Sequence, residues 1–423
     1  MGSNSRRTQM AVVLLAVAVS GGRVLAQREP ADPKLTTLYT FTGSGGGQPV
    51  GGLVRGPNGA LYGATYSSGG VVFQLRPPTV PGGTWTETVL HRFGGASDGD
   101  LPLAGLAFDR KGRLYGTTSG GGVYGYGTVF RLTPPAAAGA AWTEDVLYSF
   151  AGGNDGAYPE SELVFSGDGV LYGSTFNGGA AGCIVCGTVF ALKPPAMEGG
   201  AWTERILYRF PESGVDGQGP FGSLLRTNDG TLYGTTITRA TGGGGYVFQL
   251  KPPTVVGGGW SESVLASFYG TTPPVNPSNL TFGGNGALYG STEFGSSSNN
   301  GPFAGMIFVL TPPSTAGGAW LETVLYSFTG GADGFVPASI VLGKNGALYG
   351  TTEAGGRSGQ GTVFILRPPT VAGGSWSETV LYSFTGGSDG WSPETLLIDS
   401  NGALYGTTGG ADSNLGTVFR LTP

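Results

Sequence analysis

Short apolar runs separated by glycine-rich turns follow one another along the chain, and no helical period appears beyond the first 26 residues. The runs are rich in Val, Thr, Leu, Tyr and Phe, which suit extended strands, and the glycines between them suit tight turns. Runs such as Thr379–Phe384 are apolar on both sides instead of alternating, which is typical of strands covered on both faces. The pattern therefore predicts an all-β fold of many short, well-buried strands.

Three strand-like motifs recur in a fixed order, each of them seven times, with a mean repeat of about 57 residues. The tyrosines of a Leu-Tyr-Gly motif are Tyr62, Tyr115, Tyr172, Tyr233, Tyr289, Tyr349 and Tyr405. A motif of the type Gly-Thr-Val-Phe ends at Phe73, Phe130, Phe190, Phe248, Phe308, Phe364 and Phe419. A motif of the type Trp-Thr-Glu-Thr-Val-Leu-Tyr-Ser-Phe ends at Phe93, Phe150, Phe210, Phe268, Phe328 and Phe384, and its seventh copy, Leu38–Phe41, lacks the Trp.

Each repeat contains four strand-like runs, and seven four-stranded units describe a seven-bladed β-propeller. A β-solenoid is the alternative, although its coils are usually much shorter than this repeat. The first motif of the chain is a copy of the fourth run, and the last is a copy of the third. We therefore expect Leu38–Phe41 to complete the last blade beside Gly416–Leu421, which removes an open sheet edge.

The repeated phrase Asn-Gly-Ala-Leu-Tyr-Gly-Thr-Thr, as at Asn401–Thr408, predicts the inner hairpin of a blade. Asn-Gly makes the tight turn, and the Gly after the Tyr leaves room where the blades crowd. The first-to-second and third-to-fourth connections then share one face. The opposite face carries the loops between blades and the loops between second and third strands, which vary most and are the expected place for binding.

These motifs together resemble the tandem repeats of the GloVer-type, choice-of-anchor exported bacterial proteins. The resemblance covers residues 35–423 and rests on LYGTT, GTVF, WTETVLYSF and the Gly-Gly-x-Asp-Gly stretches. It implies an exported protein built of propeller-like repeats, and it brings no activity or catalytic residue with it. The chain departs from the family in lacking a C-terminal sorting anchor, which favours a free or periplasmic protein.

Residues 1–26 are typical of a signal peptide, with Arg6 and Arg7 near the start, the apolar run Met10–Val19 and a Val-Leu-Ala cleavage site. The run is too short to span a bilayer, which needs ~20 apolar residues. The arginine pair leaves a twin-arginine route open beside general secretion. We expect a secreted or periplasmic protein in which residues 27–33 form a linker and residues 34–423 form one domain.

The composition narrows the classes of partner. A net charge of −5 argues against nucleic acid or an anionic membrane as the partner. The hydrophobic fraction of 39% is enough for a core, although 83 of the 423 residues are glycine. A phosphate-binding glycine loop would need a helix after a strand, and no helix is expected. We therefore expect a monomer without a cofactor or a membrane span.

Cys183 and Cys186 are the only cysteines and share the variable loop of the third repeat. In an exported protein this pair predicts a local disulfide, while a redox pair would want a helix start beside it. The sole histidine, His91, replaces the Tyr of a Tyr-Ser-Phe strand. Its isolation weakens any serine–histidine mechanism, and a metal site is not expected.

Asp-Gly pairs recur between the repeats, at Asp98, Asp155, Asp216, Asp333 and Asp389. Asp and Gly in this order are typical of turns, because Asp supplies an acceptor and Gly allows positive φ. Calcium binding is the functional alternative, although one carboxylate per loop is poor for a cation that takes ~6–8 oxygens. We therefore interpret these pairs as blade-to-blade turns.

Three carboxylates, Glu160, Glu162 and Glu394, stand near the starts of inner strands, where other repeats have small residues such as Ala104 or Ser278. Glycoside cleavage uses two carboxylates ~5–9.5 Å apart. These residues are thus the candidates for a polysaccharide lyase or glycoside hydrolase. Solvated residues at the channel mouth and polar ligand contacts are the other two interpretations.

Aromatic residues crowd the loops of the expected binding face: Tyr124, Tyr126, Tyr158, Phe221, Phe294, Phe335 and Trp391. Exposed aromatic rings stack on sugars or anchor protein partners. The ligand-binding candidates are Trp391, Tyr158, Tyr124, Tyr126 and Phe335, whereas the six Trp residues of the repeated strand should be structural. We expect a non-catalytic module that binds carbohydrate or an extracellular protein. The alternatives are the glycan-cleaving enzyme and a structural envelope protein.

Overall fold

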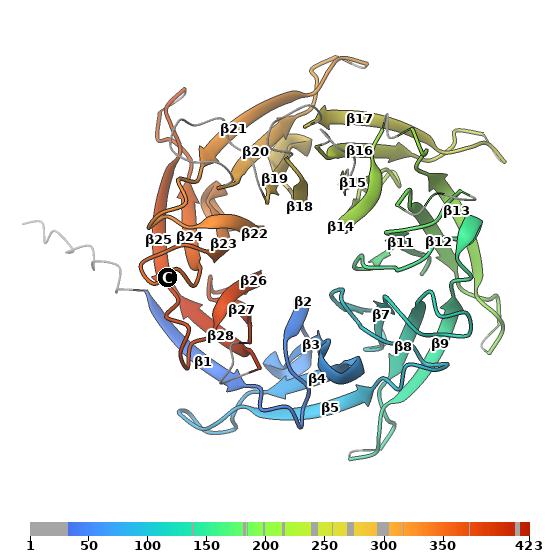
Figure 1. Ribbon diagram of the computed structural model, residues 1–423, viewed down its shortest axis with the longest axis horizontal. Coiled ribbons are helices and arrows are strands. Elements are labelled where there is room, and N and C mark those ends of the chain that lie inside the picture. The colour runs from blue at the N-terminus through green and yellow to red at the C-terminus, as the bar shows by residue number, and fades with distance from the viewer. Residues whose placement is uncertain are drawn as a thin grey trace, which may run out of the picture. The chain divides into compact units, whose positions relative to one another are not determined.

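The computed structural model describes residues 33–423 except 138, 181–182, 184, 198, 214–215, 238–243, 256, 269–274, 294–303, 316, 372 and 411–414. The expected signal peptide and most of the expected linker lie outside the described residues. Seven four-stranded antiparallel sheets form a ring around a central axis (Figure 1). The all-β, seven-bladed propeller predicted from the repeats is confirmed.

Each blade contains four strands in chain order from the axis to the rim, except that the seventh takes its outer strand from the start of the chain. Blade 1 contains β2(Pro49–Arg55), β3(Leu61–Thr65), β4(Val71–Arg76) and β5(Thr86–Arg92), and blade 2 contains β6(Ala107–Phe108), β7(Leu114–Thr118), β8(Thr128–Thr133) and β9(Thr143–Ser149). Blade 3 contains β10(Val164–Phe165), β11(Leu171–Thr175), β12(Thr188–Lys193) and β13(Thr203–Arg209), and blade 4 contains β14(Gln218–Arg226), β15(Leu232–Ile237), β16(Tyr246–Lys251) and β17(Ser261–Ser267). Blade 5 contains β18(Pro277–Phe282), β19(Leu288–Thr292), β20(Met306–Thr311) and β21(Leu321–Ser327), and blade 6 contains β22(Phe335–Leu342), β23(Leu348–Ala354), β24(Thr362–Arg367) and β25(Ser377–Ser383). Blade 7 contains β26(Trp391–Ile398), β27(Leu404–Gly409), β28(Thr417–Thr422) and β1(Lys34–Thr40). Short 3-10 turns lie at Pro57–Gly59, Ser67–Gly69, Gly153–Asp155, Gly284–Gly286 and Lys344–Gly346.

The ring is closed by pairing between the two ends of the described chain. Strand β1 lies antiparallel to β28, from Lys34 opposite Thr422 to Thr40 opposite Thr417. The amide of Phe41 continues the pairing by donating to the carbonyl of Gly416 at 2.9 Å. The expected closure is confirmed, and the strand begins four residues before the predicted Leu38.

The inner hairpins turn as the Asn-Gly motif predicts in several blades. Asn58 and Asn285 both have φ of 56°, and the glycines that follow them also have positive φ, which is the conformation of the tightest hairpin turns. In the last blade Asp399 takes over, because its Oδ1 accepts the amides of Asn401 and Ala403 at 2.8 and 3.0 Å. The same Asn-Gly sequence therefore occurs in two kinds of turn, one with positive φ at the Asn and one held by an aspartate side chain.

The glycine of each Leu-Tyr-Gly motif is required by a phenylalanine on the neighbouring strand. A Cβ at Gly116 would lie 2.6 Å from Cζ of Phe130, and the other six positions meet the equivalent Phe in the same way. The close approach therefore occurs within a blade and not, as the sequence predicted, where blades crowd, because the Phe ring of the adjacent strand covers the glycine. Phe130 also meets Phe93 of the preceding blade edge-on, with ring centroids 5.0 Å apart, so one buried ring joins two sheets.

Tryptophans of the repeated strand pack between blades. Trp142 of blade 2 meets the ring of Tyr62 in blade 1 with centroids 6.3 Å apart. The same pairing recurs at Trp202, Trp260, Trp320 and Trp376. These rings bury large apolar areas between the sheets, which agrees with a structural role.

Candidate functional site

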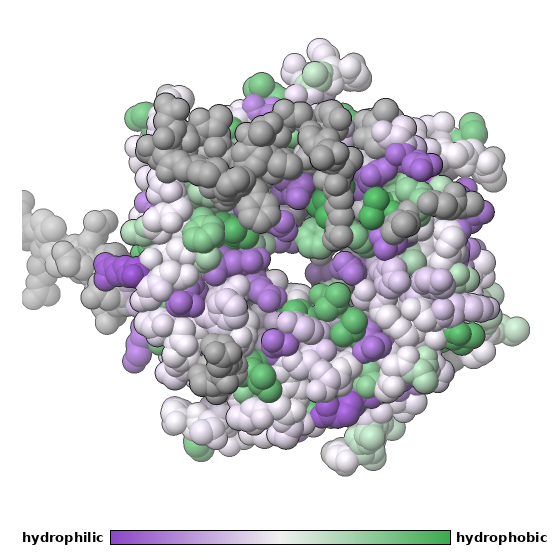
Figure 2. Space-filling model, viewed as in Figure 1, coloured by the Kyte–Doolittle hydropathy of each residue, from purple (hydrophilic) through white to green (hydrophobic). Residues whose placement is uncertain are grey.

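The loops sort onto two faces of the ring. The variable-loop face carries the connections between second and third strands and the loops that enter each inner strand; the turn face carries the Asn-Gly turns and the Pro-Pro connections. The innermost strands, such as β2, β14, β22 and β26, border the centre, where the surface is hollowed and hydrophilic side chains gather beside a few apolar ones (Figures 1 and 2).

The residue before the inner-strand proline has an unusual backbone in five blades: Gln48, Leu101, Tyr158, Val336 and Ser392 have φ between 48° and 57°. Such conformations cost roughly 1–3 kcal/mol for residues other than glycine, and they persist only where the surroundings impose them. Tyr158 is held by two hydrogen bonds of 2.9 Å, because its amide donates to Tyr126 and its carbonyl accepts from Phe176. Backbone pairing therefore fixes where this side chain stands.

The predicted aromatic candidates fall into three groups. Tyr124 and Tyr126 are 60% and 39% exposed on the second-to-third loop of blade 2, and the ring of Tyr126 lies 6.1 Å from that of Tyr158, edge-on. Trp391 is 40% exposed at the start of β26 in blade 7. Phe335 is partly buried against the core between blades 5 and 6. Phe294 lies outside the described residues.

The three predicted carboxylates each contact a different neighbouring blade. Oε1 of Glu160 accepts a hydrogen bond from Ser119 of blade 2 at 3.0 Å. Oε2 of Glu162 lies 3.5 Å from the Ser223 hydroxyl of blade 4. Glu394, in β26, interacts electrostatically with Glu353 of blade 6. Glu394 is thus coupled to a carboxylate that was not predicted.

Two further glutamates, not predicted from the sequence, belong to this group: Glu353 interacts with Glu394, and Glu293 interacts with Glu353. Burial raises the pKa of Glu394 to about 8, and the charge of Glu353 adds to this effect. The same two causes raise the pKa of Glu293. Burial raises the pKa of Glu353 itself. Glu293 and Glu353 directly follow the Leu-Tyr-Gly-x-Thr run, where other repeats have Tyr, Ser, Phe, Ile or Gly. Aligning that position across the repeats would have revealed them.

Glu162 occupies space that glycine provides in neighbouring blades. A Cβ at Gly105 would lie 3.0 Å from its Oε2. Burial raises the pKa of Glu162 to about 7, although the hydrogen bond from Ser223 opposes this. Burial thus brings the pKa of a carboxyl just before β10 to the neutral range.

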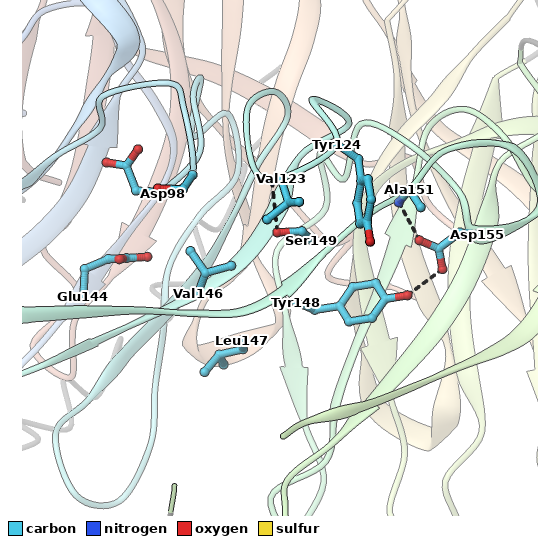
Figure 3. A pocket seen from close by; sticks show the side chains of 11 residues that line it. Asp98, Val123, Tyr124, Glu144, Val146, Leu147, Tyr148, Ser149, Ala151 and Asp155 are labelled. Carbon is cyan, nitrogen blue, oxygen red and sulfur yellow. Dashed lines mark hydrogen bonds between the residues drawn. The ribbon is translucent and has the colours of Figure 1, made fainter. Parts of the chain in front are cut away.

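A groove of about 810 Å³ runs along the outer strand of blade 2 on the variable-loop face (Figure 3). We call it the acidic groove; its polar and aromatic lining includes Asp98, Tyr124, Glu144, Tyr148 and Asp155. Asp98 and Glu144 lie at one end, and Tyr124 stands near Tyr148 and Asp155 at the other (Figure 3). Burial, reinforced by Asp98 and Asp145, raises the pKa of Glu144 to about 7.

The Asp-Gly loops are held by their own aspartates. Oδ2 of Asp155 accepts the amide of Ala151 at 2.7 Å, and its Oδ1 accepts the hydroxyl of Tyr148 at 2.6 Å. Asp333 and Asp389 bind Thr329 and Thr385 in the same way. These contacts support the interpretation as turns. Across the described part of the chain, no group of three or more potential metal-ligating side chains is found.

The remaining chemical candidates pack locally. The sulfur atoms of Cys183 and Cys186 lie at disulfide distance, with their Cα atoms 5.7 Å apart. Nε2 of His91 lies 3.4 Å from Asp98, and its ring meets Phe93 edge-on. Burial lowers the pKa of His91, although Asp98 opposes this. Among the described residues, no helix is long and apolar enough to cross a membrane.

Fold and loops together define a propeller of seven tandem repeats with a varied loop face. The Gloeobacter/Verrucomicrobia repeat model matches residues 19–239, 70–304 and 224–423, and the chain belongs to this family. The expected resemblance is thereby confirmed.

Solved structures agree on the fold. The extracellular domain of a candidate one-component system from B. thetaiotaomicron is similar at 14% identity and a TM-score of 0.53, over 92% of this chain and 41% of its own. A candidate 6-phosphogluconolactonase from Bacteroides uniformis is similar at 17% identity and a TM-score of 0.52, over 85% of this chain and 91% of its own. At such identities the likeness shows the fold alone. A search of curated proteins finds no match.

Proposed function

We propose that the protein is an exported, non-catalytic binding module that holds a carbohydrate on its variable-loop face. The observation that carries this proposal is the acidic groove, where the 60% exposed ring of Tyr124 stands near Asp155 and shares the lining with Asp98 and Glu144. An aromatic ring offers a sugar its stacking surface, and carboxylate oxygens accept hydrogen bonds from sugar hydroxyls. An extracellular protein is the other ligand class that such a surface fits.

Further contacts are proposed for Trp391, Tyr126, Tyr158 and Phe335. Trp391 has the strongest claim among the four, because a 40% exposed indole at the entry to an inner strand is free to stack. Tyr126 and Tyr158 support each other edge-on and would offer one surface between blades 2 and 3. Phe335 is packed against the core, and we expect it to contribute least.

A glycan array with the mature protein tests this proposal. We expect binding to a neutral polysaccharide that is lost in Tyr124→Ala and weakened in Trp391→Ala, with polymer length unchanged. Met197→Ala is the matched control, because this side chain is 80% exposed on the turn face. Equal binding by wild type and Tyr124→Ala would remove the acidic groove from the proposal.

A glycan-cleaving enzyme is the second candidate, and the coupled pair Glu394 and Glu353 favours it. A carboxyl whose pKa is about 8 is protonated at neutral pH and can act as a general acid. Shortened polymer that persists in Tyr124→Ala but disappears in Glu394→Gln would support this candidate over the binding module. Glu160→Gln and Glu162→Gln then show whether the other predicted carboxylates take part.

Export is proposed from the signal-like N-terminus and supported by the cysteine pair. A disulfide persists in oxidising compartments and is rare in the cytosol. Alkylation of the unreduced mature protein, followed by mass spectrometry, should find no labelled thiol at Cys183 or Cys186. Two labelled cysteines in freshly exported protein would contradict the disulfide.

A further inference from the structure

A second groove lies on the turn face, at the seam where blade 7 meets blade 1. It has a volume of about 750 Å³ and lies between β1, β28 and the Pro-Pro connection Pro77–Trp85. We call it the arginine groove, after Arg55 and Arg420, which line it with Tyr405, Trp85, Asn58 and Thr36. Its lining contains no acidic side chain, although the whole chain has a net charge of −5.

Arg420 is an exposed cation of this groove. It lies directly opposite Tyr405 on β27 and opposite Thr36 on β1. Its guanidinium carbon lies 5.9 Å from the centre of the Tyr405 ring. Among the described residues it has no carboxylate partner within ion-pair distance. A neutral threonine on the neighbouring strand leaves its charge available to a ligand.

The same position in blade 2 shows what a satisfied arginine looks like. Arg131 stands in the repeated Gly-Thr-Val-Phe-Arg-Leu run, as Arg420 does. It lies opposite Asp145 on β9, and its guanidinium donates to that carboxylate at 2.8 and 3.2 Å. Thr36 stands at the closure seam where blade 2 has Asp145, so Arg420 lacks the cross-strand carboxylate that Arg131 has.

Arg55 brings a second guanidinium to the same aromatic ring. Its guanidinium carbon lies 5.6 Å from the centre of the Tyr405 ring, and its Nη1 pairs with Asp399 at 3.0 Å. The Asp399 side chain is only 3% exposed and also accepts two backbone amides. This anchoring holds Arg55 in place, and its remaining N–H groups can still donate.

We propose that the arginine groove binds a uronic-acid oligosaccharide, with Arg420 and Arg55 recognising its carboxylates. A guanidinium matches the two oxygens of a carboxylate with two parallel hydrogen bonds. The partly exposed ring of Trp85 offers a surface for a sugar ring. Asn58 and Thr36 provide neutral donors and acceptors for hydroxyl groups. This combination fits an acidic sugar better than an acidic peptide, because each uronate carries its carboxylate on a ring, whereas Asp and Glu side chains have none.

Calorimetry with three acidic hexasaccharides, made of galacturonate, glucuronate and mannuronate, tests the proposal. We expect at least one to bind, and its methyl ester to bind at least about ten-fold more weakly, because esterification removes the charge. Arg420→Gln should weaken binding by about ten-fold or more, and Arg420→Lys by less. Arg131→Gln is the matched control and should bind as the wild type does.

Three other results would contradict the proposal. Failure of all three hexasaccharides to bind excludes uronates, and equal losses in Arg420→Gln and Arg131→Gln place the ligand elsewhere. Poly-glutamate that binds as tightly as the best hexasaccharide would assign the groove to a protein partner instead. Because the site lies on the opposite face, Tyr124→Ala should leave uronate binding unchanged, so this test fails or succeeds independently of the neutral-glycan proposal.

Discussion

The acidic groove and the arginine groove belong to neighbouring parts of one repeat architecture, yet they carry opposite charge. At the seam between blades 1 and 2, the loop after the outer strand supplies Asp98, which lies close enough to raise the pKa of Glu144. At the closure seam, the loop after β1 has no aspartate, and the Tyr39 hydroxyl donates directly to Glu87 at 2.9 Å. In blade 2 the equivalent Tyr148 donates to Asp155 instead. Where the loop lacks an aspartate, the tyrosine of the outer strand thus bonds to a glutamate of the next blade instead.

The apolar interiors of the two seams are nearly the same. Phe41 meets Phe73 across the closure seam with ring centroids 5.1 Å apart, and Phe93 meets Phe130 across the next seam at 5.0 Å. All four rings are buried. The comparison shows that the same aromatic packing joins the blades at both seams, whereas the polar side chains around it differ from one seam to the next.

The largest expected effect is loss of this core. Phe41→Ala and Phe93→Ala should each lower the free energy of unfolding by about 3–5 kcal/mol, because each leaves a cavity between two sheets. Urea unfolding followed by tryptophan fluorescence measures both, and Val80→Ala, 63% exposed at a hairpin tip, is the control. A clearly smaller loss for Phe41→Ala would mean that the closure seam is held less by its core than the other seams are.

A smaller effect should come from the outer-strand glutamates that face Asp-Gly loops. Burial is the main cause that raises the pKa of these side chains to about 7, and the charge of a neighbouring aspartate adds to it. The four residues are Glu144, Glu204, Glu262 and Glu378. The folded state therefore holds these protons more tightly than the unfolded chain, and the stability they contribute is lost as pH rises from about 4.5 to about 7. We expect the thermal midpoint to fall by several degrees over this range.

Glu378→Gln sharpens the pH prediction, because this residue faces Asp333 in a seam without the histidine. The variant should show a shallower fall of the thermal midpoint with pH than the wild type. His91 works in the opposite direction, since its lowered pKa costs stability as pH falls through about 6.5. An unchanged pH slope in Glu378→Gln would contradict the raised pKa of this carboxyl.

The smallest effect should come from removing the hydroxyl of the outer-strand tyrosine, which donates to Glu87 at the closure seam and to Asp155 in blade 2. Tyr39→Phe removes the direct bond to Glu87, and Tyr148→Phe removes the bond to Asp155. Each should cost about 1–3 kcal/mol, because the acceptor is a carboxyl group that remains partly buried. The Glu87 carboxyl has an unpartnered oxygen in the folded state, whereas Asp155 keeps its bond to the Ala151 amide. Tyr39→Phe should therefore be the more costly change, and equilibrium unfolding of both variants at one pH decides.

The repeats alone predicted most of the fold, and they did so through particular residues. Seven copies of Leu-Tyr-Gly gave the number of blades, and Leu38–Phe41 gave the closure, because a strand without its sheet must pair with the last blade. The glycine after each Tyr was expected where the blades crowd, whereas its close approach lies inside the blade. The sequence did not show that the approaching group was the Phe of the same blade, since strand register was not yet known.

The candidate site was less predictable. Tyr124, Tyr126 and Tyr158 were expected on one face, and the structure places the last two in contact. Glu353 was missed, although it is the carboxyl coupled to Glu394. Its interaction joins two blades, and side chains from separate repeats come together only when the ring is formed. The freed charge of Arg420 was missed for the same reason, because its neighbour Thr36 lies at the other end of the chain.

The sequence by itself determined the strands, their order within a blade, the number of blades and the residues that fill the core. These properties depend on local patterns of apolar residues and turns that each repeat contains in full. Only the tertiary structure decided which charged groups meet at each seam, and therefore which carboxyls hold protons and which arginine is left for a ligand. Such contacts depend on distances between different blades, and the free energy of a charge changes with its neighbours and its burial, which no single repeat contains.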